Sequence, residues 1–374
     1  MNYIIYRVKI ILTFLWKISY PLYGSVNIRM KKTFVALIVA LTLATLLASI
    51  FVTRDANQPF AYLFVYFEGN EDLQADGTRP LQEAVFYALS RDGYNYTALN
   101  NNQPILVSNS GTGGVRDPFI FKTEDGDYVM LATDMHARYG WRSNNSLVTW
   151  RSNDLIDWQE ETIIPLAGQY PVLEKSTAAW APQAIYDEQR GEYMVYFSAD
   201  KPYEMVYRTA DNGFKCIYYF YTKDFKTLTS EPQILLEIPG EDIIDGDIVK
   251  DGETYRFFYK TSANQGIKML SSATLTSGYA DLKEVSTIMC EGSNAYKLIN
   301  KDKWIVMADL HWGGWWGVNY VLYETEDFSN FTPLHMTGDY SLSFTPRHGY
   351  VITITRAEYF NLIKEYNNGK RISR

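Results

Sequence analysis

The stretch FIFKTEDGDYVMLATD, from Phe119 to Asp134, and the LVTWRSNDLIDW that follows it, ending at Trp158, form one copy of an internal repeat. The copy holds a short apolar strand, a Gly-marked turn, a longer strand of large apolar residues, a further strand and a polar turn that closes on an aromatic residue. Self-similarity over tens of residues indicates the architecture before any single motif does.

The theme recurs three times downstream and once, incompletely, upstream. The later copies run, by first and last residue, from Ala184 to Phe225, from Asp247 to Tyr279 and from Ala295 to Phe328. The upstream copy has strands beginning at Tyr62 and Ala84 but no first strand of its own. The missing strand stands at the other end of the chain, as GYVITIT from Gly349 to Thr355.

This arrangement predicts an all-β, five-bladed β-propeller whose ring is closed by the C-terminal strand. Units of about four short strands are typical of propeller blades, and radial repetition leaves only short, protected sheet edges. A β-sandwich with Tyr-rich strands is the alternative, since regularly spaced short strands also suggest sandwiches. The sandwich does not explain why the strand missing from the first unit lies at the far end.

Composition agrees with one large domain over residues 59–374. Hydrophobic residues make up 47% of the chain, and an aromatic share of 16% predicts that some rings form surface platforms or pocket walls. The formal charge of −8 and the pI near 5.2 argue against a nucleic-acid groove and are compatible with a neutral substrate.

Residues 1–58 predict an export signal or membrane anchor with a flanking linker. Thr33 to Val52 is uncharged and mostly apolar, with basic residues before it. Its length lies between that of a signal-peptide core and that of a spanning helix, so cleavage stays open, as does initiation at Met1 or Met30. We expect a periplasmic, cell-surface or secreted protein that meets a membrane only through this segment.

The two cysteines, Cys216 and Cys290, fall in different repeat units. A disulfide between them would need a geometric coincidence, so we expect two buried thiols.

Three acidic residues stand at the entrances of apolar strands in the repeat. They are Asp117 in VRDPFIF, Asp245 in IDGDIV and Glu291 in CEGSNAYKL. The inner strands of a propeller run the same way along its axis, so residues at their entrances share one opening. An Asp before Pro or Gly is ordinary turn chemistry when it occurs once. Three carboxylates that repel one another at matching positions of a repeat predict a catalytic site.

These strings resemble glycoside hydrolase family 43, five-bladed propeller enzymes that remove arabinofuranosyl, xylosyl or galactosyl units from plant polysaccharides. The resemblance covers nearly the whole chain after Phe60 and includes WAPQAIYD at Trp180 and PRHGYVITIT at Pro346. It implies an inverting mechanism in which Asp117 is the general base, Glu291 the general acid, and Asp245 orients Glu291 and raises its pKa. Physics agrees, because a third carboxylate near an acid helps it keep its proton.

Two features depart from the family pattern or leave a choice. The WAP element is often followed by an acid, but here Gln183 follows it, so any polar contact to substrate there would be neutral. Asp247 lies two residues from Asp245 on the same side of a strand. The family pattern favours Asp245, which directly follows Ile244.

The remaining candidates are binding residues. Trp141, Trp180, Trp315 and Arg347 are candidates for contacts to the sugar, together with Gln183. His348 resembles the family's axial histidine, which holds water or calcium in the central channel, or it is a core histidine. We expect no required cofactor and at most an optional structural calcium ion. His136, His311 and His335 have no spacing partner and are expected on loops or the surface.

Two other functions remain open beside an inverting arabinofuranosidase, xylosidase or galactosidase that acts at chain ends. Retaining fructosidases are also five-bladed propellers, but their Asn-Asp-Pro-Asn-Gly nucleophile motif is absent here. A non-catalytic carbohydrate-binding propeller would need aromatic platforms and amides rather than three acids. The sequence leaves the sugar, the linkage and the oligomeric state open.

Overall fold

The computed structural model describes residues 39, 42, 57–69, 82–140, 144–201, 215–261, 266–310 and 319–367. All strands lie in the unit Pro59–Arg374. The predicted export segment falls almost entirely outside the described residues and stays a prediction. Among the residues that are described, no helix has the length and apolar character needed to cross a membrane.

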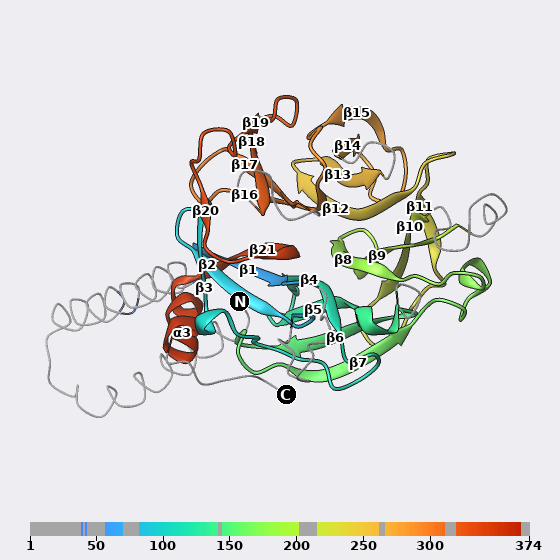
Figure 1. Cartoon of the computed structure of the whole chain (residues 1–374), viewed down its shortest axis with the longest axis horizontal. Helices are drawn as coiled ribbons and strands as arrows, with labels where there is room; N and C mark the ends of the chain where they lie inside the picture. The colour runs from blue at the N-terminus through green and yellow to red at the C-terminus, as the bar shows by residue number, and fades with distance from the viewer. Residues whose placement is uncertain are drawn as a thin grey trace, which may run out of the picture. The chain divides into compact units, whose positions relative to one another are not determined.

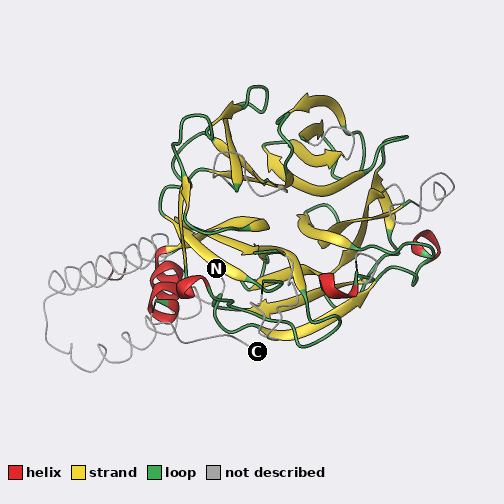
Figure 2. Ribbon diagram, in the orientation of Figure 1, coloured by secondary structure: helices red, strands yellow, loops and turns green. Residues whose placement is uncertain are grey.

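The described chain folds into five sheets, antiparallel except for one short edge strand, and these are the blades of a β-propeller (Figure 1). Figure 2 shows that strands make up most of it, with few helices. The prediction of an all-β, five-bladed propeller is therefore confirmed. We number the blades 1 to 5 in chain order and give their strands from the innermost outward.

Blade 1 contains β21 (Arg347–Thr355), β1 (Pro59–Phe67), β2 (Phe86–Ser90), β3 (Asn95–Ala98) and the short parallel β20 (Ser341–Leu342). Blade 2 contains β4 (Val115–Lys122), β5 (Tyr128–Asp134), β6 (Ser146–Ser152) and β7 (Gln159–Pro165). Blade 3 contains β8 (Trp180–Asp187), β9 (Glu192–Asp200), β10 (Lys215–Thr222) and β11 (Gln233–Leu236). Blade 4 contains β12 (Ile243–Asp251), β13 (Thr254–Thr261), β14 (Ile267–Ser272) and β15 (Ala280–Glu284). Blade 5 contains β16 (Glu291–Lys297), β17 (Trp304–Asp309), β18 (Tyr320–Thr325) and β19 (Thr332–Pro333).

The C-terminal strand closes the ring. Strand β21 pairs with β1 in an antiparallel register that includes Phe64 opposite Val351. The inner strands contact one another in the order β21, β4, β8, β12, β16 and back to β21. The strand missing from the first repeat unit is thus supplied by the last strand of the chain, as the sequence predicted.

Helix α3 (Arg356–Tyr366) fastens this closing strand. Thr355 and Glu358 form a capping box at its start, so the helix begins directly where β21 ends. Glu358 also accepts a hydrogen bond from the hydroxyl of Tyr128, at 2.5 Å, which ties the helix to blade 2. The rings of Tyr359 and Phe60, 5.5 Å apart, tie it to blade 1.

The apolar core lies between neighbouring blades, where the faces of adjacent sheets pack together. Many tyrosines are fully buried there. Their hydroxyls bond across the blades: Tyr296 donates to the carbonyl of Gly93 at 2.7 Å, and Tyr87 accepts from the indole of Trp158 at 2.8 Å. Buried tyrosine needs such partners. Many of the aromatic side chains thus pack between blades, and fewer of them form surface platforms than the composition suggested.

The two cysteines, Cys216 and Cys290, are buried free thiols, as predicted. Burial raises the pKa of Cys216 to about 12 and that of Cys290 to about 11. Neither is therefore a reactive thiolate at neutral pH.

Candidate active site

Each inner strand carries a β-bulge near its first residues. One residue there, which we call the bulge residue, is displaced from the ladder: Asp117, Ala181, Asp245, Gly292 and His348. The first four have positive φ, between 47° and 60°. Left-handed backbone is uncommon outside glycine and costs free energy, so its recurrence marks these strand ends as candidates for function.

The bulges correct one detail of the sequence interpretation. Asp117 and Asp245 are bulge residues, but the matching residue of blade 5 is Gly292, and Glu291 precedes it. Glu291 therefore matches Arg116 and Arg347, which precede the bulges of blades 2 and 1. A side chain at Gly292 would be excluded, because an added Cβ would lie 2.4 Å from Cγ of His348.

Opposite the residue before each bulge lies one residue of the second strand, which we call the facing position. Its occupants are Phe67, Thr133, Ser198, Lys260 and Asp309. Three of them accept the backbone N–H of the next blade's bulge residue. The donor–acceptor pairs are Ala181 to Thr133 Oγ1 at 2.8 Å, Asp245 to Ser198 Oγ at 3.1 Å and His348 to Asp309 Oδ2 at 2.8 Å. These bonds satisfy buried donors that the bulges remove from the ladder.

Asp117 is held as a carboxylate. Thr133 donates its hydroxyl to Oδ2 at 2.8 Å, and Nδ1 of His348 lies 3.5 Å from Oδ1. Burial by itself would raise the pKa of Asp117, but the hydrogen bond and charge of His348 outweigh it, so the pKa lies below its usual value. With 16% of its side chain exposed, this carboxylate can still meet a water molecule.

Glu291 lies between two cations. Nζ of Lys260 is 2.6 Å from Oε2, and Nη2 of Arg347 is 2.7 Å from Oε1. Arg347 also donates from Nε to Asp309 at 3.0 Å, and the side chain of Asp309 is fully buried. The Glu291 side chain is 13% exposed, so it too can reach a ligand. Arg347, a candidate for contact with the sugar, is thus a partner of two acids.

Asp245 lies beside Glu291 through the backbone. Its Oδ2 accepts the N–H of Gly292 at 3.1 Å. Burial and the nearby charges of Glu291 and Asp117 raise the pKa of Asp245 to about 6, against the opposing charge of His348. Asp245 thus adds negative charge next to Glu291, which suits the expected role of a carboxyl that favours protonation of its neighbour.

Asp247 lies deeper and is fully buried. Its Oδ2 accepts the N–H of Ala295 at 2.7 Å, and burial raises its pKa to about 8. A fully buried carboxyl cannot touch a sugar, which favours Asp245 over Asp247 for contact with the reacting groups.

His348 is buried beside Asp117, and its environment does not fit a direct metal ligand. Burial would lower its pKa, but the hydrogen bond with Asp117 and the charges of the surrounding acids raise it to about 9. An imidazolium donates from both nitrogens and has no lone pair for a cation. Within the described ranges, no group of three or more His, Cys, Asp or Glu residues could hold a metal ion. A calcium ion held through water, as the family resemblance implies, stays a prediction.

The structure describes some of the predicted sugar-binding residues and not others. Trp180 begins β8, is partly exposed, and has Nζ of Lys215 4.4 Å from its ring centroid, so one face of the ring is taken. Gln183 is buried, and its Oε1 accepts the hydroxyl of Tyr196 at 2.8 Å. Trp141 and Trp315 lie outside the described residues, as does His311. Their predicted roles stay predictions.

Sequence reasoning missed several residues of this region. Asp309 ends β17 and was visible as the Asp of MAD, which recurs in SAD and ATD, although in those two strands the facing positions are Ser198 and Thr133 and not the Asp. Thr133 and Lys260 carried no comparable signal. His136, expected on a loop or the surface, lies on the loop that follows β5 but is buried there, with Nδ1 2.6 Å from Glu83, which also pairs with Arg116 at 3.0 Å.

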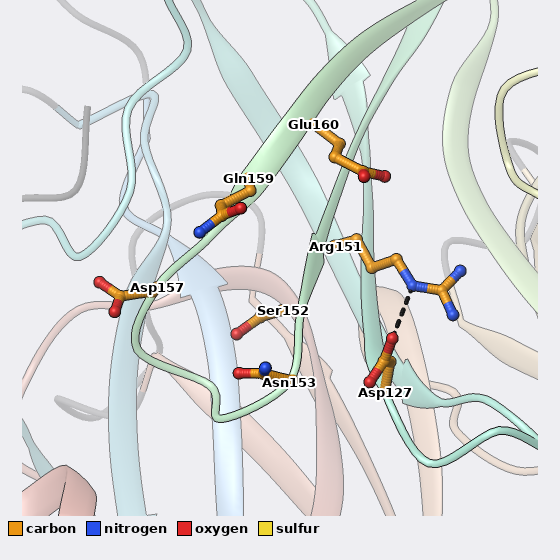
Figure 3. A pocket seen from close by; sticks show the side chains of 7 residues that line it. All are labelled: Asp127, Arg151, Ser152, Asn153, Asp157, Gln159 and Glu160. Carbon is orange, nitrogen blue, oxygen red and sulfur yellow. Dashed lines mark hydrogen bonds and ion pairs between the residues drawn. The ribbon is translucent and has the colours of Figure 1, made fainter.

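A separate polar hollow lies at the opposite end of blade 2 (Figure 3). Its lining residues are Asp127, Arg151, Ser152, Asn153, Asp157, Gln159 and Glu160. Arg151 donates from Nε to Asp127 at 2.8 Å, the contact drawn in Figure 3. The strand register places it far from Asp117, since Tyr128 pairs with Ser152 whereas Arg116 pairs with Thr133.

Comparison with known proteins identifies the family. Residues 58–360 match a family model described as "Probable glycosyl hydrolase domain", whose label relates it to glycosyl hydrolase family 43. The chain belongs to this family. The resemblance to glycosyl hydrolase family 43 seen in the sequence is thereby confirmed.

One curated relative is named alpha-L-arabinofuranosidase and comes from Bifidobacterium longum subsp. longum. The two are 28% identical over 184 residues, which cover 45% of this chain and 17% of the relative. This chain thus matches only a small part of that protein's length.

Solved structures with a similar fold share few residues with this chain. An endo-1,4-beta-xylanase from Bacteroides thetaiotaomicron is 13% identical with a TM-score of 0.48, covering 79% of this chain and 98% of the other. A family 62 alpha-L-arabinofuranosidase domain from Coprinopsis cinerea is 14% identical with a TM-score of 0.47, covering 65% and 75%. An arabinanase from Bacillus subtilis is 16% identical with a TM-score of 0.42, covering 60% and 75%. These likenesses are weak, because every TM-score lies below 0.5.

Proposed function

We propose that this glycosyl hydrolase cleaves terminal α-L-arabinofuranosyl units with inversion of the anomeric centre. The observation that supports it most is the pair of partly exposed carboxyls, Asp117 and Glu291, held in different electrostatic surroundings at the same end of β4 and β16, the two inner strands that flank β21. An acid and a base of a glycosidase need such different surroundings.

In the proposed reaction Asp117 is the base. Its lowered pKa keeps it ionised at neutral pH, so it accepts a proton from a water molecule as the water oxygen attacks the anomeric carbon. Glu291 gives its proton to the glycosidic oxygen as the bond from the anomeric carbon to that oxygen breaks, and the bonding electrons leave with the oxygen. Lys260 and Arg347 then face the carboxylate that Glu291 becomes.

Asp245 acts on Glu291 rather than on the sugar in this scheme. Its hydrogen bond from Gly292 fixes the backbone next to the acid. Its negative charge opposes that of Lys260 and Arg347 on the same carboxyl and so favours the protonated form of Glu291 that the proposed reaction needs.

The choice of arabinofuranose is supported by the name of the Bifidobacterium longum relative and by the family resemblance. Xylosides and galactosides are the neighbouring choices, and attack at chain ends is the expected mode. Retaining, fructosidase-like hydrolysis and sugar binding without catalysis are the outcomes that would replace this proposal. Export, independence from a cofactor and absence of nucleic-acid partners accompany it as expectations.

Two measurements test the proposal. A screen with aryl arabinofuranosides, xylosides, galactosides and galactofuranosides should give the highest kcat/KM for the arabinofuranoside. Proton NMR of the first product should then show the anomer opposite to that of the substrate. Net retention would favour the fructosidase-like reading, and no turnover of any glycoside despite binding would favour the non-catalytic one.

A further inference from the structure

Lys260 departs from the way in which neighbouring blades are joined. At the facing position, Thr133, Ser198 and Asp309 each offer an oxygen to the N–H of the next bulge residue. An ammonium group cannot accept a hydrogen bond. Phe67 is the remaining occupant. Its ring lies beneath the guanidinium of Arg116, with the ring centroid 4.6 Å from Cζ of Arg116.

The boundary between blades 4 and 5 does not need Lys260 to satisfy its backbone. The N–H of Gly292, which has no acceptor at the facing position, donates to the carboxylate of Asp245 instead. A short polar residue would therefore suffice at position 260. A long cation whose side chain is only 13% exposed calls for another reason.

Its contact supplies that reason. Nζ of Lys260 lies 2.6 Å from Oε2 of Glu291, while Arg347 holds Oε1. The charged groups around Glu291 come from four other elements of the ring: Asp245 on β12, Lys260 on β13, Asp309 on β17, and Arg347 with His348 on β21; Asp117 on β4 faces His348. Lys260 is thus one of two cations in direct contact with the proposed acid.

We propose that Lys260 is a positioning residue that fixes the Glu291 carboxyl and stabilises its ionised form, so that Glu291 is a stronger acid toward the leaving group. The inference rests on the proposed role of Glu291. As the proton moves from Glu291 to the glycosidic oxygen, negative charge develops on the carboxyl between Lys260 and Arg347. Stabilisation of that charge favours the transfer, and it also lowers the pH above which the acid is empty.

The direct test is carbon NMR of the full chain labelled at the Glu side-chain carboxyl carbon, with the Glu291 signal assigned by its loss in Glu291→Gln. In Lys260→Met, the titration midpoint of Glu291 should lie at higher pH than in the parent. At a pH above both midpoints, the fraction of Glu291 that is protonated should be about tenfold or more higher in the variant. Lys260→Thr, which installs the residue found at position 133, should shift it equally. Lys260→Arg should titrate close to the parent, because it keeps the charge.

Lys303→Met is the matched control, since Lys303 pairs with Glu324 at the end of blade 5 opposite to Glu291 and should leave the Glu291 titration unchanged. All variants are compared only if they melt like the parent. The kinetic counterpart is the pH profile on a poor leaving group: in Lys260→Met and Lys260→Thr the alkaline limit should rise and the acid plateau fall, with a smaller change on a nitrophenyl glycoside.

The outcomes separate this inference from the proposed function. An unchanged Glu291 titration in both Lys260→Met and Lys260→Thr overturns the inference, whether or not the parent hydrolyses glycosides. A raised titration in a parent that cleaves no glycoside supports the coupling and overturns the proposed function. A raised titration with an unchanged pH profile contradicts the claim that the coupling serves acid catalysis.

Discussion

The boundary between blades 2 and 3 and the boundary between blades 4 and 5 use equivalent positions for different purposes. At the first, Thr133 accepts the N–H of Ala181 and donates to Asp117, so one hydroxyl joins two blades and orients the proposed base. At the second, Lys260 contacts Glu291, and Asp245 receives the backbone donor. The first boundary is held by an uncharged hydroxyl, and the second depends on charge.

This difference shows how a repeated framework yields two unlike carboxyls. Both proposed catalytic acids stand beside a bulge, but Asp117 is itself displaced from the ladder, and Glu291 is the last paired residue before the displacement. Their surroundings therefore differ although their blades repeat. Unequal surroundings for two carboxyls are what acid and base roles require.

Both boundaries depend on a closed ring of blades. The largest effect is therefore expected from a truncation that opens the ring. A chain ending at His348 lacks most of β21, so β1 loses its inner partner and exposes an unpaired edge. We expect loss of cooperative folding and aggregation, measured by thermal melting and light scattering. The control ends at Thr355, keeps β21 and lacks α3 with the residues after it, and should melt cooperatively at a lower temperature than the parent. A soluble, cooperatively melting chain ending at His348 would contradict ring closure.

The second prediction distinguishes Asp117 from Glu291 by how strongly the loss of activity in each variant depends on the leaving group of the substrate. Asp117→Asn should reduce kcat/KM about 10²- to 10⁴-fold on every glycoside, because all need activated water. Glu291→Gln should lose as much on natural glycosides but markedly less on aryl glycosides with acidic phenols, which depart unprotonated. Steady-state kinetics on both substrate types, for variants that melt like the parent, provides the check. Equal losses for Glu291→Gln would assign the acid elsewhere, with Asp245 the next candidate.

The fold could be predicted from the sequence because it rests on repetition, which is visible in strings such as the one from Phe119 to Asp134. The site could be predicted only in part. Asp117, Asp245 and Glu291 stand out by position, but the one-residue offset of Glu291 depends on bulge geometry. Lys260 could not be found, because a lone Lys at the end of an apolar strand gives no sign of what lies across the blade boundary.

A third prediction concerns stability at the boundaries. Ser198→Ala removes the acceptor for the buried N–H of Asp245 and should cost about 1–3 kcal/mol of unfolding free energy. Thr133→Val does the same to Ala181 and should cost a similar amount. Lys260→Thr leaves no backbone donor unpaired and should cost less than either. Urea denaturation midpoints measure all three, and a larger loss for Lys260→Thr would show that Lys260 is structural.

The last prediction is a pH dependence of stability. The pKa of His348 is raised to about 9 in the folded protein, so the stability it contributes is present below its ordinary value near 6.5 and is lost as pH rises through about 9. Asp247, with its pKa raised to about 8, acts in the same sense, since charging it in the core opposes folding. The urea midpoint should therefore fall between pH 6.5 and 9.

The variant that isolates this effect is Asp247→Asn, which stays uncharged and keeps an oxygen for the N–H of Ala295. Its urea midpoint should fall less steeply than the parent's over the same range. Parallel pH curves for parent and variant would show that Asp247 does not titrate there.

The closing strand also governs when the catalytic groups meet their partners during synthesis. Strand β21 supplies Arg347 to Glu291 and His348 to Asp117, yet it leaves the ribosome after the other four inner strands. Until it docks, both proposed catalytic carboxyls lack a cation that the finished enzyme gives them. A nascent chain can therefore build blades 2 to 5 early, while the electrostatic balance of its active site arrives with the last strand.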